Sequence, residues 1–249
     1  RPKPERDDPY TLVKNEGLAL RGTMIYGQGF VLTPEEKNEL CSRNQKNSTM
    51  IFPYLGGKEV NESPTQTHSR YVINFRSLPL AEAERWPQLL KIVRDKVKPE
   101  RDQLGGYSVA DGRRTNWWRF GTVTPALDAA VEQLSSCLVT AIISKHLIFS
   151  FQPSDRVFSH KLYVFPSDRF TVFAVLQSRI HEPWVLLLTS TMKTDINYSA
   201  SDCFGTFPFA NSDPRVVIPT VESAGKAFYE ARARFMLDTD QGLTKTYNA

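Results

Sequence analysis

A short segment near residue 195 carries three polar side chains at a spacing that suits contact with nucleic-acid bases. In Lys193-Thr-Asp-Ile-Asn-Tyr198, an extended backbone places Lys193, Asp195 and Asn197 on one face, because successive side chains of a strand point to opposite faces. A lysine, a carboxylate and an amide supply the donors and acceptors that recognise base edges in the major groove. The same row suits a solvated strand face equally well, so both interpretations stay open at this point.

Two basic segments indicate a surface for phosphates. Residues 85–101 hold six cations against two acids, and Arg113-Arg-Thr-Asn-Trp-Trp-Arg-Phe120 interleaves three arginines with three aromatic residues. A solvated helix face is the alternative interpretation of the first segment. Lys145 interrupts an apolar run, and we expect it at a strand end because burying an unpaired charge is costly. The predicted phosphate contacts are Arg119, Lys145, Arg114, Lys96 and Lys98.

Motifs for catalysis are missing from the sequence. No Gly-x-Gly-x-x-Gly and no Walker loop occurs, and no helix pattern directly follows the two glycines of Tyr26-Gly-Gln-Gly-Phe30. The four histidines and three cysteines show no spacing typical of metal ligands. Cys137 and Cys203 are interpreted as buried, inert thiols. We therefore expect no catalytic residue, no cofactor site and no metal site in this chain.

Length and composition indicate a globular protein. The chain has 249 residues, a formal net charge of +4, 41% hydrophobic and 23% charged residues, which excludes a disordered chain. The longest apolar stretch, 138–151, is interrupted by polar residues, so no membrane span is expected. An odd number of widely spaced cysteines is typical of a reducing cytosol. A first residue other than Met is most simply explained by a piece of a longer polypeptide.

Local patterns predict an α+β fold with a mixed, mainly antiparallel sheet, flanking helices and a short C-terminal helical segment. Thr33-Pro-Glu-Glu36 predicts a helix start with a capping box, and Gly56-Gly57 predicts a loop over 52–64. The other predicted helices are 80–97, 125–136 with Thr124 as cap, 177–188 and 221–238. The predicted strands are short ones within 17–32, then 70–75, 138–143, 147–151, 157–165 and 170–175.

Ten blocks of sequence, taken in order, resemble one known family. They are GQGFVLTPEE (27–36), IFPYLGGKEVN (51–61), RYVINF (70–75), KVKPER (96–101), WWRF (117–120), LVTAIISK (138–145), VFSHK (157–161), LQSRIHE (176–182), YSASDCF (198–204) and TFPF (206–209). Together they resemble the target-recognition region of MmeI-like type IIL restriction–modification proteins and of related large bacterial adenine methyltransferases. The resemblance extends over about 17–209, and the whole run of blocks is more specific than any one of them.

The resemblance implies a module that recognises duplex DNA sequence for an upstream catalytic domain in the same polypeptide. That domain would transfer a methyl group from S-adenosylmethionine to an adenine flipped out of the duplex, and a nuclease often precedes it in this family. No cofactor would bind this chain itself, no membrane partner is implied, and the location would be the bacterial cytoplasm. In the family, the strand bearing His160 and Lys161 lies near the row of Lys193, so both are weaker candidates for contact with bases.

The expected division of the chain is a linker at 1–16, a recognition domain at 17–212 and the start of a C-terminal helical segment at 213–249. We expect the helix at 221–238 to lack packing partners. The alternatives are a non-catalytic protein-interaction or structural module of a large bacterial protein, and a free-standing enzyme with a pocket that the sequence does not reveal.

Overall fold

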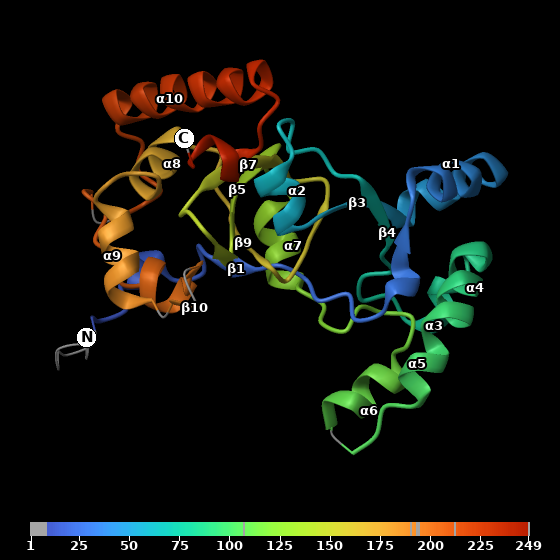
Figure 1. Cartoon of the computed structure of the whole chain (residues 1–249). Helices are drawn as coiled ribbons and strands as arrows, with labels where there is room; N and C mark the ends of the chain where they lie inside the picture. Colours follow the sequence, from blue (N-terminus) through green and yellow to red (C-terminus); the bar gives the residue numbers. More distant parts are fainter. Residues whose placement is uncertain (1–8, 107, 190, 193–194, 212, 249) are drawn as a thin grey trace.

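The computed structural model describes residues 9–106, 108–189, 191–192, 195–211 and 213–248 (Figure 1). Within these residues, helices flank three sheets in which all strand pairs but one are antiparallel. The predicted α+β class is therefore confirmed. No helix in the described part of the chain is both long enough and apolar enough to cross a bilayer.

The central sheet separates two of the three hydrophobic cores. Its strand order is β1-β9-β5-β7. Along β5, Leu138 packs into one core, whereas Cys137 and Val139 pack into another, as the alternation of side chains in a strand requires. The strands are β1 (Leu20–Arg21), β5 (Ser136–Ala141), β7 (Phe149–Pro153) and β9 (Leu162–Phe165).

A second sheet, in the order β2-β4-β3-β8, lies at the other end of the molecule with α1 and α3 to α6 around it (Figure 1). Strands β3 and β8 are parallel. Helix α1 (Pro34–Arg43) begins with the predicted capping box between Thr33 and Glu36. The strands are β2 (Val31–Leu32), β3 (Ile51–Leu55), β4 (Arg70–Ile73) and β8 (Val157–Phe158), and the other helices are α3 (Leu80–Ala83), α4 (Pro87–Lys96), α5 (Lys98–Asp102) and α6 (Ser108–Thr115).

Four predicted elements are wrong. The predicted strand over 157–165 is divided into β8 and β9, which belong to different sheets. The predicted loop contains β3 and a short helix, α2 (Gly57–Glu62), whose first turn is closed by Glu59 accepting from the Gly56 amide. The predicted helix over 80–97 is divided at Trp86, because Pro87 starts a new helix.

Residues 170–176 form helix α8 (Phe170–Leu176) instead of a strand. There, Glu222 accepts from the backbone amides of Phe170 and Thr171 at 3.0 and 2.6 Å, so a distant carboxylate stabilises the helix start.

The C-terminal helix α10 (Pro219–Asp238) packs on α8 and β7, so the expectation that it lacks partners is wrong (Figure 1). Glu222, near the start of α10, makes the contacts with α8 described above. Arg232, further along α10, donates to the carbonyl of Phe149 at 2.8 Å and lies over the rings of Phe173 and Tyr229. The remaining elements are α7 (Pro125–Val131), β6 (Ile143–Ser144), α9 (His181–Leu188), β10 (Thr191–Met192), β11 (Asp195–Asn197) and α11 (Leu243–Thr246).

The segment before β1 is held by one buried amide. Asn15 donates to the carbonyls of Phe204 and Phe207 at 2.8 and 2.9 Å. This attaches part of the proposed linker to the body of the protein, while residues 1–8 lie outside the described part. The boundaries at 16 and 212 stay predictions.

A fully buried arginine joins three segments near the second sheet. The Arg101 side chain has no exposed surface and forms no ion pair with any described carboxylate. Instead it donates to five backbone carbonyls. These belong to Ile25 (3.2 Å), Tyr26 (2.8 Å), Asn116 (3.2 Å), Trp117 (3.2 Å) and Arg119 (2.6 Å). Burial lowers the pKa of Arg101 to about 10, so the side chain still carries its charge at neutral pH.

Replacing Arg101 by Met should lower the free energy of unfolding by about 3–5 kcal/mol, because the hydrogen bonds to five carbonyls are lost and those of Tyr26, Trp117 and Arg119 keep no other described donor. Chemical denaturation of the chain measures this change. The matched control is Arg85→Met at an exposed position, which should change stability by about 0.5 kcal/mol at most. Equal effects of the two substitutions would contradict a structural role for the Arg101 contacts.

Candidate nucleic-acid interface

A groove of about 770 Å³ runs between α2, β6 and the turn from β8 to β9. It contains three of the residues predicted to contact DNA: Lys145, His160 and Lys161. Two carboxylates, Glu59 and Glu62, also line it. The other cations that line it are Arg21, Lys58 and Arg70, so positive side chains outnumber negative ones on its walls.

The turn from β8 to β9 presents His160 and Lys161 on a fixed backbone. The amide of Ser159 donates to Leu55 and that of His160 donates to Thr23, both at 2.9 Å. A side chain at Gly22 would lie 2.2 Å from the Ser159 carbonyl oxygen, so only glycine allows this close approach. The position of the two polar residues therefore depends on contacts with β3 and with the segment after β1.

His160 is neutral at pH 7. Burial first, and then the positive charges of Arg21 and Lys161, lower the pKa of its imidazole below the ordinary value. Its backbone carbonyl accepts from the Arg21 side chain at 3.0 Å. Lys161 beside it is exposed and forms no ion pair with any described residue. The turn thus offers a neutral ring next to a full positive charge.

Strand β11 lies beside β6, which leads into Lys145. Asn197 pairs with Ile143, and Ile196 pairs with Ser144. Ile196 is buried whereas Asp195 and Asn197 are half-buried, so the predicted alternation is confirmed for these three residues. Strand β10 pairs with β11 in an antiparallel ribbon. Lys193 lies outside the described residues, between the two strands.

Lys145 follows β6 directly, as expected. Its side chain is exposed, and no described carboxylate forms an ion pair with it. The sequence alone gave no reason to choose Arg21, Lys58, Arg70 or Tyr54, which also line the groove. Near Lys58 the sequence offers only Gly56-Gly57, which predicts a loop, whereas the structure has the start of α2 there.

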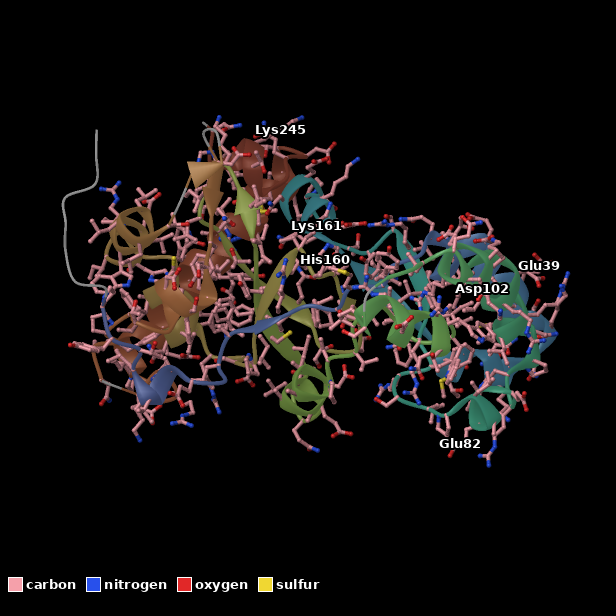
Figure 2. All side chains as sticks on the ribbon, turned by 90° about the horizontal axis from the view of Figure 1, so that it is seen from below. Glu39, Glu82, Asp102, His160, Lys161 and Lys245 are labelled. Carbon is pink, nitrogen blue, oxygen red and sulfur yellow. The ribbon has the colours of Figure 1, made fainter. Side chains whose placement is uncertain are left out.

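The other four predicted phosphate contacts do not line the groove and lie on α4 to α6 and the segment after it. Lys96 is 3.6 Å from Glu36, and Lys98 is 2.6 Å from Asp102. Arg119 donates to the Leu78 carbonyl at 3.0 Å and lies over the Trp118 ring. Arg114 pairs with Asp111 and also donates to Leu104. Figure 2 shows this separation, with Asp102 far from His160 and Lys161.

One wall of the groove is an ion pair between the buried Glu59 and the half-buried Arg70. Glu59 accepts from Arg70 Nε and Nη2 at 3.1 and 2.6 Å, and from the Gly56 amide at 3.1 Å. Arg70 in turn lies over the ring of Tyr54. Burial alone would raise the pKa of Glu59, but these hydrogen bonds and the charge of Arg70 lower it below its ordinary value of 4.5.

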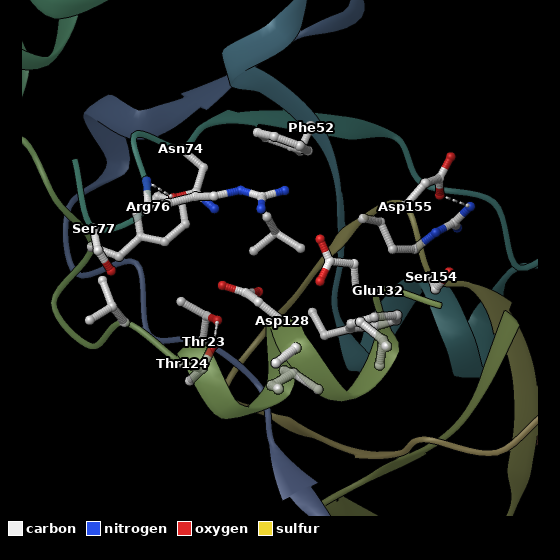
Figure 3. A pocket seen from close by; sticks show the side chains of 18 residues that line it. Thr23, Phe52, Asn74, Arg76, Ser77, Thr124, Asp128, Glu132, Ser154 and Asp155 are labelled. Atoms are coloured by element: carbon white, nitrogen blue, oxygen red, sulfur yellow. Dashed lines mark hydrogen bonds and ion pairs between the residues drawn. The ribbon is translucent and has the colours of Figure 1, made fainter. Parts of the chain in front are cut away.

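A second cavity, of about 460 Å³, lies between α7 and the second sheet (Figure 3). Arg76, Asp128 and Glu132 point into it. Desolvation raises the pKa of Asp128, and the charge of Arg76 lowers it in part. None of the residues predicted to contact DNA lines this cavity, and no group of three metal-binding side chains occurs among the residues described.

The cysteines are free thiols. Burial raises the pKa of Cys137 to about 12 and that of Cys203 to about 11, so neither forms a thiolate nucleophile at neutral pH. Both are buried, as expected. His181 is also buried, with its pKa lowered to about 3, and its Nε2 lies 3.2 Å from the Tyr198 hydroxyl within the core.

Comparison with known proteins identifies the family. The model of the MmeI target recognition domain matches residues 13–211. The chain belongs to the MmeI target recognition domain family. The solved structure of the type IIL restriction–modification enzyme MmeI in complex with DNA is similar with a TM-score of 0.64 and 20% identity, over 98% of this chain and 30% of MmeI.

A second relative is known from its sequence. DNA methyltransferase A of Bacillus subtilis (strain 168) is 34% identical over 62 residues, which make up 25% of this chain and 7% of the relative. The chain therefore spans less than a third of the lengths of these relatives. The family match begins before Asn15, which anchors the N-terminal segment, and ends before α10. The predicted resemblance over 17–209 is confirmed.

Replacing Glu59 by Gln should lower the free energy of unfolding by about 1–3 kcal/mol at pH 7, because Arg70 loses a charged acceptor. A lowered carboxyl pKa stabilises the fold above the unfolded value near 4.5, and this contribution is lost as pH falls through the folded value. The difference between the two proteins should therefore shrink below about pH 4.5 in denaturation curves. Glu62→Gln, at an exposed site, is the control. A constant difference across this pH range would contradict the assignment.

Proposed function

We propose that this chain recognises a DNA sequence for a methyltransferase domain in the same polypeptide. One observation carries the proposal. In a member of the MmeI target recognition domain family, Lys145, His160 and Lys161 line one groove, and strand β11 pairs with β6 directly before Lys145. Duplex DNA carries closely spaced negative charges, so a fixed cationic groove is suited to its backbone.

The ribbon of β10 and β11 is the proposed base-reading element. A major groove is wide enough for a two-stranded β-ribbon, and Asp195 and Asn197 share one face of β11. From the sequence, we assign Lys193 and Asp195 to one G·C pair, since lysine donates to guanine and aspartate accepts from the cytosine amine. Asn197 suits an adenine. His160 and Lys161 are assigned to a neighbouring position.

Lys145 is the first of the proposed phosphate contacts, because it lines the groove without an ion-pair partner among the described residues. Arg119, Arg114, Lys96 and Lys98 would contact phosphates only where DNA extends toward α4 to α6. Exposed ion pairs contribute little to stability, so Lys96 and Lys98 can exchange their carboxylates for phosphates at small cost.

The chemistry belongs to a domain outside this chain. We propose that it transfers a methyl group from S-adenosylmethionine to an adenine amine in a flipped-out base, in the cytoplasm of a bacterium. The name of the Bacillus subtilis relative supports the methyl transfer. This chain itself would bind neither the cofactor nor a membrane. The alternative is a protein-interaction module. No contact among the described residues of the groove supports it, and it predicts that the protein does not bind DNA.

Exchanging the two charges, as Lys193→Glu with Asp195→Arg, should change the preferred base at a single position of the methylated sequence. Desolvated charges that face the wrong base cost about 1–3 kcal/mol. Methylation mapping of DNA from cells that express the full-length protein measures the outcome. The control exchanges the exposed pair on α4, as Lys91→Glu with Asp95→Arg, and should leave specificity unchanged. Unaltered specificity with normal activity in the first variant would overturn the base-reading assignment.

Replacing Lys145 by Ala in the full-length protein should weaken binding to all duplexes alike. Each neutralised phosphate contributes about 0.9 to the slope of log K against log salt, so the slope should become shallower by about that amount. Titrations with cognate and unrelated duplexes at several salt concentrations provide the measurement, with Lys37→Ala on α1 as control. Weaker binding to the cognate sequence alone would show that Lys145 contacts a base instead.

A further inference from the structure

The last helix of the chain returns to the groove after α10. Leu243, at the start of α11, is fully buried in the same core as Leu55 and Val60. A side chain at Gly242 would lie 2.3 Å from the backbone of Glu62, so the chain approaches α2 as closely as a glycine permits. This places α11 firmly against the helix that forms one wall of the groove.

The residues after α11 contact the turn that carries Lys145. The Asn248 side-chain oxygen lies 2.8 Å from Nε2 of His146, and the Tyr247 ring packs beside the same imidazole. The Tyr247 hydroxyl accepts from Arg232 at 3.2 Å. The C-terminal segment therefore links α10 to His146, next to a proposed phosphate contact.

Helix α11 adds an exposed positive charge at the border of the groove. Thr244 lines the groove. Lys245, the next residue, is exposed and has no ion-pair partner among the residues described. In the view of Figure 2, Lys245 lies at the upper edge of the molecule, above Lys161 and His160. By contrast, the exposed Lys226 on α10 lies 4.0 Å from Glu230.

We propose that α11 forms part of the DNA-binding surface and that Lys245 contacts a phosphate of the duplex. The inference rests on the proposed function and extends it to a segment that lies beyond the family match at 13–211. A phosphate is favoured over a base because Lys245 belongs to the helix that borders the groove, and its long stem ends in a compact charge free to follow the backbone. The recognition surface would then be completed only when the C-terminal segment is docked.

Binding titrations with the full-length protein test this inference. The probes are a duplex with the methylated sequence and an unrelated duplex of equal length, each at several salt concentrations. Lys245→Ala should weaken binding to both and reduce the salt slope by about 0.9. Lys245→Arg should retain the slope, and Lys226→Ala should leave both affinity and slope unchanged. Thermal unfolding of Lys245→Ala should match that of the unaltered protein, because the side chain is exposed.

The outcomes separate this inference from the proposed function. If Lys245→Ala binds as well as the unaltered protein at every salt concentration while Lys145→Ala binds less well, α11 is not part of the surface and the inference is overturned. If Lys226→Ala has the same effect as Lys245→Ala, the loss reflects overall charge and the inference is also overturned. If the unaltered protein binds neither duplex, the proposed function fails, and the inference fails with it.

Discussion

The arrangement of the second sheet depends on the charge buried at Arg101. Five carbonyls from two separate segments converge on one guanidinium. Those of Ile25 and Asn116 also accept from a backbone amide, whereas those of Tyr26, Trp117 and Arg119 have no other donor among the described residues. These contacts hold the loop at Tyr26 to the Trp117 segment and to α5. In the same loop, Gly29 lies so close to Lys96 that a side chain there would be 2.4 Å from the Lys96 Cβ. The loop continues directly into β2, the edge strand of the second sheet.

Two strands of the second sheet lead to residues that line the groove. Strand β3 leads into Gly56 and the Glu59–Arg70 pair, and β8 leads into Ser159 and His160. The opposite wall comes from β6 of the third sheet, and β11 pairs with β6 without lining the groove itself. Residues from widely separated parts of the chain therefore meet along one surface. A groove of this origin requires the whole domain to be folded.

Some elements of the fold can be predicted from neighbouring residues in the sequence, whereas others depend on residues far away in the chain. The capping box at Thr33 and the alternation around Ile196 could be predicted, because each depends on neighbouring residues alone. Helix α8 could not, since its apolar sequence favours a strand and its first amides are satisfied by Glu222, some fifty residues away. Lys145, His160 and Lys161 were found through composition and resemblance. Arg21 and Arg70 were missed because only the tertiary pairing of strands brings them to the groove.

The alternation along β11 has an evolutionary consequence. Ile196 fills the core, while Asp195 and Asn197 on either side face outward and support little of the packing. Substitutions at the outward positions cost little stability, because surface changes away from core contacts are usually well tolerated. In the proposed function, a lineage can therefore acquire a new target sequence through a few substitutions on one strand, while selection for folding preserves the isoleucine between them.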